Sequence, residues 1–531
     1  MARWGPLLVL LLALALALVL HQQSRLELGL DLDLDRLKAL FRTPPDQGPH
    51  QGPHQGPHQG PHQGPDQGPH QGPHQGPDRG KTLEQRVSEA WESLITPPQT
   101  RWTRAAVGVN SCVDVVVSGV ALLEALGLGP GSSPDPVSGL DHEVLGSLED
   151  LMDTFLFFMS RGAAAERFFS NSELFQTIAQ TALQIPGAKL YVGGNAALIG
   201  QKLASSPDTE VLLSGPVGPK LHELLDEKIV VSPESLRETD EYHLILEYQT
   251  GEHWGPLVAP QANRFIFSHD EANSHMTLTE ALVQSLDQFE PDLLVLSGLH
   301  MMEGLRPEAR NHRLDQVVAL LSELSVPVHL ELASMTDLGF MQLILSFQVF
   351  PLVSSLGLNE QELLFLSRAV DGPHSDVSWS EVGVTSAAAV GVASDVLQWV
   401  LQHFGAVSSS SLLSRVHFHS LPFHVVAVVT GRWGNQAASS AAGARTASAQ
   451  ACGRAHVHAP EAQLKAPLEF NTNNTHMLRL DPDQPITVWH QHHVTFHLSP
   501  VLVCKQPIRT VGLGDAISAN GLLFSEILPP K

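Results

Sequence analysis

Cysteine and positive charge are both scarce in this chain. Only three of the 531 residues are cysteine, Cys112, Cys452 and Cys504, so at most one intramolecular disulfide can form and a disulfide scaffold is excluded. Lysine and arginine total 31 against 55 acidic residues, which gives a formal net charge of −24. A protein of that charge repels polyanions, so we expect no nucleic-acid partner. Any phosphate must be bound by local backbone N–H groups, a few cationic side chains and divalent metal ions.

Two common nucleotide-binding motifs are also missing. The sequence contains no GxxxxGK[ST] P-loop, and no GxGxxG follows its first strand-like segment. Their absence argues against a P-loop nucleotide enzyme and against a common dinucleotide-binding fold. The apolar share of 43% is nevertheless typical of a globular protein, and the length allows at least two lobes.

Residues 1–22 predict a signal peptide or a short membrane anchor. A charge-free apolar run extends from Leu7 to Leu20, which suits a signal-peptide core and falls short of the roughly 20 residues that span a bilayer. We therefore expect entry into the secretory pathway, with the protein in the endoplasmic reticulum lumen, secreted, or tethered to the membrane. Residues 23–84 predict a disordered linker, because a (D/H)QGP repeat at 46–80 offers almost no large apolar side chain.

Histidine gathers in three places. The repeat carries six histidines, which could bind a transition metal or could be repeat expansion without a function: His50, His54, His58, His62, His70 and His74. Two further clusters read HFHSLPFH (417–424) and WHQHHVTFH (489–497). No cysteine or carboxylate lies at ligand spacing in either cluster, which argues against a metal site there.

Residues 85–531 have the pattern of an α/β domain. Helix-like segments of about ten to twenty residues separate several short apolar runs, which indicates serial βα units and a mostly parallel sheet. Residues 118–185 and 228–270 alternate aromatic and polar residues and predict a smaller β-rich lid domain inserted in the large one. The predicted strands are AAVGVN (105–110), KLYVGGN (189–195), EVLLSG (210–215), DLLVLSG (292–298), VPVHLEL (326–332) and VSSLGLN (353–359).

The segment TVGLGD near the end of the chain predicts an anion site. Gly512 and Gly514 lack a Cβ, so the backbone can approach a ligand, and the helix-like run that follows would aim its first N–H groups at an anion. Asp515 stands at the start of that run, where a carboxylate can take a proton from a hydroxyl that attacks a phosphoryl group. An N-cap aspartate after a glycine turn is the structural alternative.

Acidic residues follow three successive strand-like runs. Glu303 and Glu331 follow the first two, and Asn359 and Glu362 follow the third. Parallel strands end at one edge of a sheet, so these side chains would converge there, and Mg²⁺ prefers such oxygen ligands. Each glutamate alone could be a solvated loop residue, but their repetition at equivalent places favours a metal–nucleotide site.

The segment TVGLGDAIS resembles the signature of ribokinase-like sugar kinases. Further blocks occur in order over about 85–529 and are similar to the ADP-dependent glucokinases of the vertebrate type. They are GVNSCVDVVVSGV, YVGGNAALIGQKLA, HLILEYQ, NRFIFSHD, SGLHMMEG, VHLELAS, SLGLNEQELLFL and VLVCKQPIRTVGLGD. The resemblance implies a three-layer α/β/α ribokinase-like domain with a lid. It also implies a monomer that transfers the β-phosphoryl group of Mg-ADP to the 6-hydroxyl of glucose, giving AMP and glucose 6-phosphate.

The resemblance also assigns roles to residues. Asp515 matches the catalytic base, and Gly512 to Gly514 match the anion hole. The predicted Mg²⁺-associated acids are Glu303, Glu331, Glu362 and Asp515, and Asn359 begins the NxxE element beside the nucleotide. The predicted glucose contacts are Asp114, Glu166, Gly194, Asn195 and His243, and Arg264 matches an arginine that reaches the nucleotide phosphates.

Two alternatives stay open from the residues alone. One is an ATP-dependent ribokinase-like kinase for another sugar or a nucleoside, because the spacing of the glycines does not measure the number of phosphates. The other is an inactive luminal sugar-binding protein. The complete acidic set speaks against the second, since a protein without activity would be free to lose its metal ligands.

Overall fold

The computed structural model describes residues 80–129, 139–333, 335, 337–407, 410–473, 476–508 and 511–529. The N-terminal apolar run and nearly all of the (D/H)QGP repeat lie outside these residues. The first element of the described residues is helix α2 (Leu83–Leu94), where Thr82 and Gln85 form a capping box, so this helix and its N-cap begin two residues before the predicted end of the linker. Within the described residues, no helix has both the length and the apolar character needed to cross a membrane.

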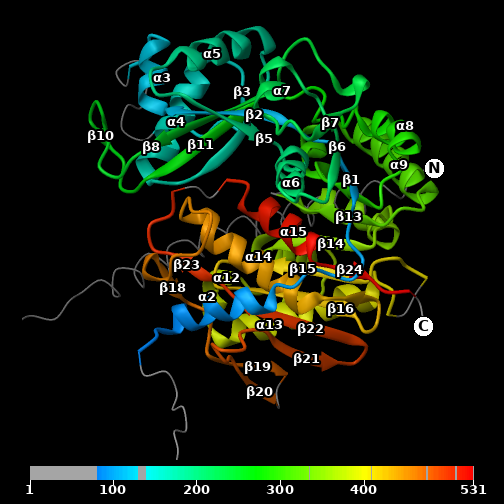
Figure 1. Ribbon diagram of the computed structural model, residues 1–531. Helices are drawn as coiled ribbons and strands as arrows, with labels where there is room; N and C mark the ends of the chain where they lie inside the picture. Colours follow the sequence, from blue (N-terminus) through cyan, green and yellow to red (C-terminus); the bar gives the residue numbers. More distant parts are fainter. Residues whose placement is uncertain are drawn as a thin grey trace, which may run out of the picture. The chain divides into compact units, whose positions relative to one another are not determined.

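Ten strands form the large sheet, in the order β21-β22-β16-β15-β14-β13-β12-β1-β6-β7 (Figure 1). The strands from β7 to β15 in this order run parallel, whereas β16, β22 and β21 form antiparallel pairs at one end. The strand bounds are β1 (Arg104–Gly108), β6 (Glu210–Ser214), β7 (Ile229–Val231), β12 (Leu293–Leu296), β13 (Val328–Glu331), β14 (Ser355–Asn359), β15 (Arg415–His419), β16 (Phe423–Val429), β21 (Thr487–Gln491) and β22 (Val494–Pro500).

Helices cover both faces of this sheet, as strand β1 illustrates. Ala106 packs into a core with α8 (Thr279–Phe289), α9 (Pro307–Glu323), α11 (Glu360–Ala369) and α13 (Ala387–His403). Its neighbours Ala105 and Val107 face the opposite core, with α6 (Asn195–Ala204) and α15 (Leu513–Leu523). Alternate residues of a strand point to opposite faces, so a continuous apolar run is buried on both sides. The predicted α/β class with a mostly parallel sheet is confirmed.

Six strands form a second, smaller sheet, in the order β3-β4-β11-β8-β2-β5. Their bounds are β2 (Cys112–Ser118), β3 (Val144–Leu145), β4 (Ala165–Phe169), β5 (Lys189–Gly193), β8 (Tyr242–Tyr248) and β11 (Asn263–Ser268). One face packs on α3 (Gly119–Ala125), α4 (Leu148–Arg161) and α5 (Ser172–Gln184). The predicted lid ranges were 118–185 and 228–270. Strand β5 and all but the last residue of β2 lie outside these ranges although both strands belong to this sheet. Strand β7 lies inside the second range but belongs to the large sheet. Apolar runs do not reveal which sheet a strand joins.

Four further helices, four 3-10 helices and four two-stranded pairs complete the described elements. The helices are α7 (Pro219–Leu224), α10 (Leu338–Ser346), α12 (Trp379–Val382) and α14 (Gln436–Ala451), and the 3-10 helices are Pro233–Ser235, Leu299–Gly304, Phe350–Leu352 and Ala459–Glu461. Two-stranded pairs join β9 (His253–Trp254) to β10 (Leu257–Val258), β17 (Trp433–Gly434) to β24 (Glu526–Ile527), β18 (Ala462–Leu464) to β23 (Leu502–Cys504), and β19 (Glu469–Asn473) to β20 (His476–Arg479).

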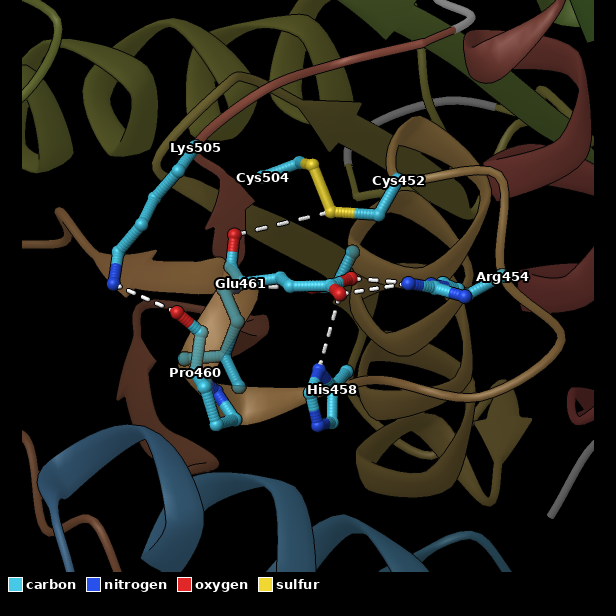
Figure 2. Close-up of a disulfide and its surroundings, with 9 residues drawn as sticks. Cys452, Arg454, His458, Pro460, Glu461, Cys504 and Lys505 are labelled. Atoms are coloured by element: carbon cyan, nitrogen blue, oxygen red, sulfur yellow. Dashed lines mark hydrogen bonds and ion pairs between the residues drawn. A yellow bond between two sulfur atoms is a disulfide. The ribbon is translucent and has the colours of Figure 1, made fainter.

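A disulfide joins Cys452 to Cys504, with their Cα atoms 5.6 Å apart (Figure 2). Cys452 follows helix α14 and Cys504 ends strand β23, so the bond fastens two elements that already contact each other. Glu461 lies beside it and accepts a 2.7 Å hydrogen bond from Arg454. The third cysteine, Cys112, is free and buried.

Candidate active site

Asn110 joins three elements at the edge of the large sheet where the parallel strands end. Its Oδ1 accepts hydrogen bonds from the backbone N–H of Ala196 at 3.1 Å and from Ser297 Oγ at 2.8 Å. Its Nδ2 donates to Asn195 Oδ1 at 3.1 Å. Asn110 is buried, so its amide groups need such partners. These bonds fix the start of α6 against the ends of β1 and β12.

Asp515 lies in the first turn of α15 and contacts the start of α6. Asn195 Nδ2 donates a 2.9 Å hydrogen bond to Asp515 Oδ1. Burial, and after it the negative charge of Glu331, raises the pKa of Asp515 to about 7, while the hydrogen bond from Asn195 acts in the opposite direction. A carboxylate that titrates near neutral pH is suited to accept and release a proton.

Glu331, the last residue of β13, is buried between two histidines. Its Oε2 lies 3.0 Å from His329 Nε2, and its Oε1 lies 3.6 Å from His419 Nε2. Burial alone would raise the pKa of Glu331, but the interactions with His329 and His419 lower it to about 2. Glu331 is therefore ionised at neutral pH. Its charge raises the pKa of His419 although burial opposes this.

Asn359 and Glu362 form the capping box of helix α11. The backbone N–H and the Nδ2 of Asn359 donate to Glu362 at 2.8 and 2.9 Å, and the Glu362 N–H donates to Asn359 Oδ1 at 3.0 Å. Burial raises the pKa of Glu362 to about 7. The NxxE spacing thus has a local structural cause, since Asn and Glu three residues apart satisfy the first N–H groups of a helix.

Glu303 contacts the start of helix α10. It lies in the 3-10 helix after β12, and its Oε1 accepts a 3.1 Å hydrogen bond from the backbone N–H of Asp337, the N-cap of α10. The charges that raise the pKa of Asp515 are those of Glu331 and Glu362. Glu331 and Glu362 therefore interact electrostatically with Asp515, and Glu303 accepts a hydrogen bond from the start of a neighbouring helix.

One face of the smaller sheet carries the predicted sugar and phosphate contacts. Asp114 pairs with His243, and His243 pairs with Ser268. On β11, Arg264 lies four residues before Ser268, and Ile266 lies two residues before it. Glu166 of β4 pairs with Ile266. Paired residues and alternate residues share a face, so Asp114, His243 and Arg264 lie on the face opposite α3, α4 and α5, as does the exposed Glu166.

Asp270 holds His243 in place behind this face. Its Oδ2 accepts from His243 Nε2 at 2.8 Å and from Ser268 Oγ at 2.9 Å, and its Oδ1 accepts from Asn273 Nδ2 at 3.2 Å. Burial alone would lower the pKa of His243, but the charge of Asp270 raises it well above its usual value. The imidazole is thereby fixed in orientation, and the carboxylate beside it favours its protonated form.

A cavity of about 750 Å³ lies between that sheet face and the helices of the large sheet. Five cationic side chains contribute to its lining, against three acidic ones: Lys189, Lys202, Arg264, Arg445 and Arg454, with Glu92, Asp114 and Glu247. Burial, and after it the charge of Arg445, lowers the pKa of Lys202. Cations gathered in one cavity of a chain with a net charge of −24 indicate a site for an anion such as a phosphate.

The predicted base lies beneath this cavity. Among the described residues, the cavity lining includes Asp114 and Arg264 but not Asp515, Glu331 or Glu362. It also includes Val511 and Asn520, on either side of Asp515 in the chain. The three carboxylates are buried and do not line the cavity, whereas Asn520 of the same helix as Asp515 does.

The predicted glycines allow three close approaches. Gly194 has φ +79°, and a Cβ there would lie 2.6 Å from Ser111 Cα. Gly512 is the N-cap of α15 with φ +68°, and a Cβ on Gly514 would lie 3.0 Å from the ring of His419. These positions bring the start of α15 against α6 and β15. Their binding of an anion stays a prediction.

Several residues of this site were missed by sequence reasoning. Asn110 ends a predicted strand and Asp270 ends the quoted block NRFIFSHD, so position after a strand was the available signal for both. His419 belongs to the cluster HFHSLPFH. The sequence argues against a metal site in this cluster because no carboxylate lies at ligand spacing within it. In the structure, Glu331 from another strand lies beside His419. Lys202 and Arg445 are helix residues without any local signal.

Residues 103–524 match a family described as the ADP-specific Phosphofructokinase/Glucokinase conserved region. An ADP-dependent glucokinase from Bos taurus is 56% identical over 453 residues, covering 84% of this chain and 89% of the bovine protein. A probable ADP-dependent glucokinase from Caenorhabditis elegans is 36% identical over 459 residues, with coverage of 84% and 89%.

Solved structures of low identity share the fold. The last common ancestor of ADP-dependent phosphofructokinases from Methanosarcinales has a TM-score of 0.58 at 17% identity, covering 83% of this chain and 97% of that one. An ADP-dependent kinase in complex with fructose-6-phosphate and ADPbetaS gives the same values. The chain thus shares the fold of these ADP-dependent kinases. With a family match over most of its length and relatives of 56% and 36% identity, the chain belongs to the ADP-specific phosphofructokinase/glucokinase family.

Proposed function

We propose that this protein transfers the β-phosphoryl group of Mg-ADP to the 6-hydroxyl of D-glucose, giving AMP and glucose 6-phosphate. The observation that carries the proposal is Asp515, a buried carboxylate with a pKa raised to about 7 at the start of a helix beside a cation-lined cavity. The ADP-dependent glucokinase from Bos taurus, 56% identical, supports the choice of donor and acceptor.

In the proposed reaction Asp515 is the general base. The 6-hydroxyl gives its proton to the carboxylate while its oxygen forms a bond to the β-phosphorus. The bond from that phosphorus to the oxygen bridging to the α-phosphate breaks, and AMP leaves with the bridging oxygen. Positioning and charge stabilisation supply most of the catalysis in such a transfer. Backbone N–H groups at the start of α15 are suited to the moving phosphoryl group.

The buried carboxylates fit a divalent cation by their chemistry. Glu331 is ionised, and the charges of Glu331 and Glu362 both raise the pKa of Asp515. A cation among these oxygens would relieve that repulsion. Bound Mg²⁺ would supply neutralisation of phosphate charge. Glu331, Glu362 and Asp515 would hold it, and Glu303 is the fourth proposed acid, whose Oε1 accepts a hydrogen bond from the backbone of Asp337.

The smaller sheet is proposed to act as the lid. Asp114 and His243 would hold sugar hydroxyls, with Asp270 fixing the His243 ring. Arg264 would reach the phosphates with other cations of the cavity. Closing this sheet over bound substrates would exclude water, which otherwise competes with the sugar for the phosphoryl group.

The secretory pathway is the proposed location. The disulfide between Cys452 and Cys504 supports it, because such bonds persist in oxidising compartments and are rare in the cytosol. The apolar run from Leu7 to Leu20 would direct entry, either as a cleaved signal or as a membrane tether.

A paired donor assay tests the function. The purified full chain with Mg²⁺ is given ADP or ATP, together with glucose, fructose 6-phosphate or ribose. We expect glucose 6-phosphate with ADP, and little product with ATP or with the other acceptors. Faster reaction with ATP would favour the kinase alternative. Glucose binding in calorimetry without any transfer from either donor would favour the inactive sugar-binding protein.

A further inference from the structure

The smaller sheet brings a thiol, a carboxylate and an imidazole together at its open face. Cys112 and Asp114 are alternate residues of β2, and His243 pairs with Asp114 from β8, so all three share one face. One ligand atom from each lies within 4.8 Å of the other two. Cys112 and Asp114 are buried, and Asp114 contributes to the wall of the cavity.

A second carboxylate orients the imidazole toward this cluster. Asp270 Oδ2 lies 2.8 Å from His243 Nε2 and accepts its proton in a hydrogen bond, so Nδ1 is the ring atom left to face a cation. Asp270 is itself fixed by Ser268 and Asn273. Metal-binding histidines are commonly held in this way, because a carboxylate on the far nitrogen sets the ring's orientation and raises its basicity.

We propose that Cys112, Asp114 and His243 form a binding site for a thiophilic divalent cation of the Zn²⁺ class. Sulfur, imidazole nitrogen and carboxylate oxygen are the ligands that Zn²⁺ takes, and three protein ligands leave a fourth position for water from the cavity. Mg²⁺ prefers oxygen ligands and does not compete well for a thiolate. The site is therefore separate in chemistry from the buried carboxylates that include Asp515.

Charge and protons balance in the proposed complex. The Cys112 thiol and the His243 nitrogen that faces it give their protons to solvent, because a metal ligand needs a free lone pair. The Cys112 thiolate and the Asp114 carboxylate then carry two negative charges against the two positive charges of the cation. The consequence for activity rests on the proposed function: Asp114 and His243 would bind either the cation or glucose, so the two would exclude each other.

Cobalt binding to the full chain tests the site. Co²⁺ replaces Zn²⁺ in such sites, and a bond from cobalt to a thiolate produces a charge-transfer absorption band in the near ultraviolet. Cys112 is the free cysteine of the chain, since Cys452 and Cys504 are joined, so without a reductant this band reports on Cys112. The histidine repeat contains no sulfur and cannot produce it. We expect the band to saturate at one cobalt per chain and to disappear on adding Zn²⁺.

Variants separate a built site from incidental binding. Cys112→Ser should abolish the band, and Asp270→Asn should weaken cobalt binding about 10–100-fold by releasing the His243 ring. His275→Gln, at an exposed histidine outside the cluster, should leave binding unchanged. Circular dichroism checks that each variant is folded. Absence of the band in the parent chain, or its persistence in folded Cys112→Ser, would overturn the proposal.

Glucose distinguishes this proposal from the proposed function. If both hold, glucose should reduce the apparent affinity for cobalt, and Zn²⁺ should inhibit phosphorylation competitively with glucose. A saturable band that glucose does not affect would support the metal site and count against the sugar contacts assigned to Asp114 and His243. Glucose phosphorylation by a chain that gives no band would refute the metal site and leave the kinase function in place.

Discussion

Asn195 Nδ2 donates a 2.9 Å hydrogen bond to Asp515 Oδ1, joining the first turns of two helices whose residues are 320 positions apart in the chain. Asn110 holds the same Asn195 side chain from the end of β1. The Asn195 side chain therefore orients the Asp515 carboxylate and also counteracts the rise in the pKa of Asp515. The acid–base properties of Asp515 are set by strand β1 and helix α6 as well as by its own helix.

Asp515→Asn should lower kcat for phosphoryl transfer by about 10²–10⁴-fold, because the amide cannot accept the hydroxyl proton. Binding of ADP, measured by calorimetry, should change by no more than a few fold. The matched control is Asp287→Asn, at an exposed aspartate of α8, which should keep full activity. Retention of a third or more of the activity in Asp515→Asn would refute its assignment as the base.

Activity should rise with pH through about 7, since the base must be deprotonated and burial with the charge of Glu331 raises the pKa of Asp515 to about 7. Asn195→Ala removes a hydrogen bond that lowers this pKa, so the rising limb of kcat/KM against pH should move to higher pH. If kcat/KM rises at the same pH in the parent protein and in Asn195→Ala, a group other than Asp515 controls the pH dependence.

Gly194→Ala should destabilise the protein more than Gly251→Ala. Both glycines have positive φ, +79° and +77°, but a Cβ on Gly194 would lie 2.6 Å from Ser111 Cα, whereas a Cβ on Gly251 has nothing within 4 Å. Backbone strain alone costs about 1–2 kcal/mol, which we expect for Gly251→Ala. Chemical denaturation measures both, and equal losses would show that the backbone at Gly194 shifts freely.

Two buried histidines should reduce stability in mild acid, whereas the raised pKa values of Asp515 and Glu362 act in the opposite direction. Burial lowers the pKa of His417 and of His424 well below the usual value of 6.5. Below pH about 6.5 the unfolded chain binds protons that the folded chain does not, so stability falls as pH falls.

His424→Leu should therefore reduce the loss of unfolding free energy between pH 7 and pH 5 by about 2 kcal/mol. His312→Leu, at an exposed histidine of α9, is the matched control and should leave the loss unchanged. Denaturation curves at the two pH values measure the effect. An identical loss in the parent and in His424→Leu would show that His424 does not control it.

The double variant Cys452→Ser/Cys504→Ser should lower the unfolding free energy by about 3 kcal/mol, because the disulfide closes a loop of 52 residues in the unfolded chain. The parent protein treated with a reductant should match the variant, and the variant should not respond to the reductant. Equal stability of parent and variant would mean that the bond contributes nothing to the fold.

The sequence predicted five of the ten strands of the large sheet, and the acidic residues at the ends of some of them, because both signals are local. A buried strand appears as an apolar run, and the residue after it lies at the edge where ligands gather. Glu331 and Asn359 followed from this rule alone. Asn110 obeys the same rule, and it was overlooked because an asparagine after a strand also suits an ordinary turn.

The sequence by itself determined the α/β class, the acidic and glycine residues near the strand ends, and, by resemblance, the family. Only the tertiary structure decided that Glu303 accepts a hydrogen bond from the N-cap of α10, that the charge of Glu331 acts on Asp515, and that β5 joins the smaller sheet. It also decided that Glu331 is ionised at neutral pH although Asp515 and Glu362 titrate near neutrality. The physical reason is that a pKa depends on burial and on charges from distant strands, which meet only when the chain is folded.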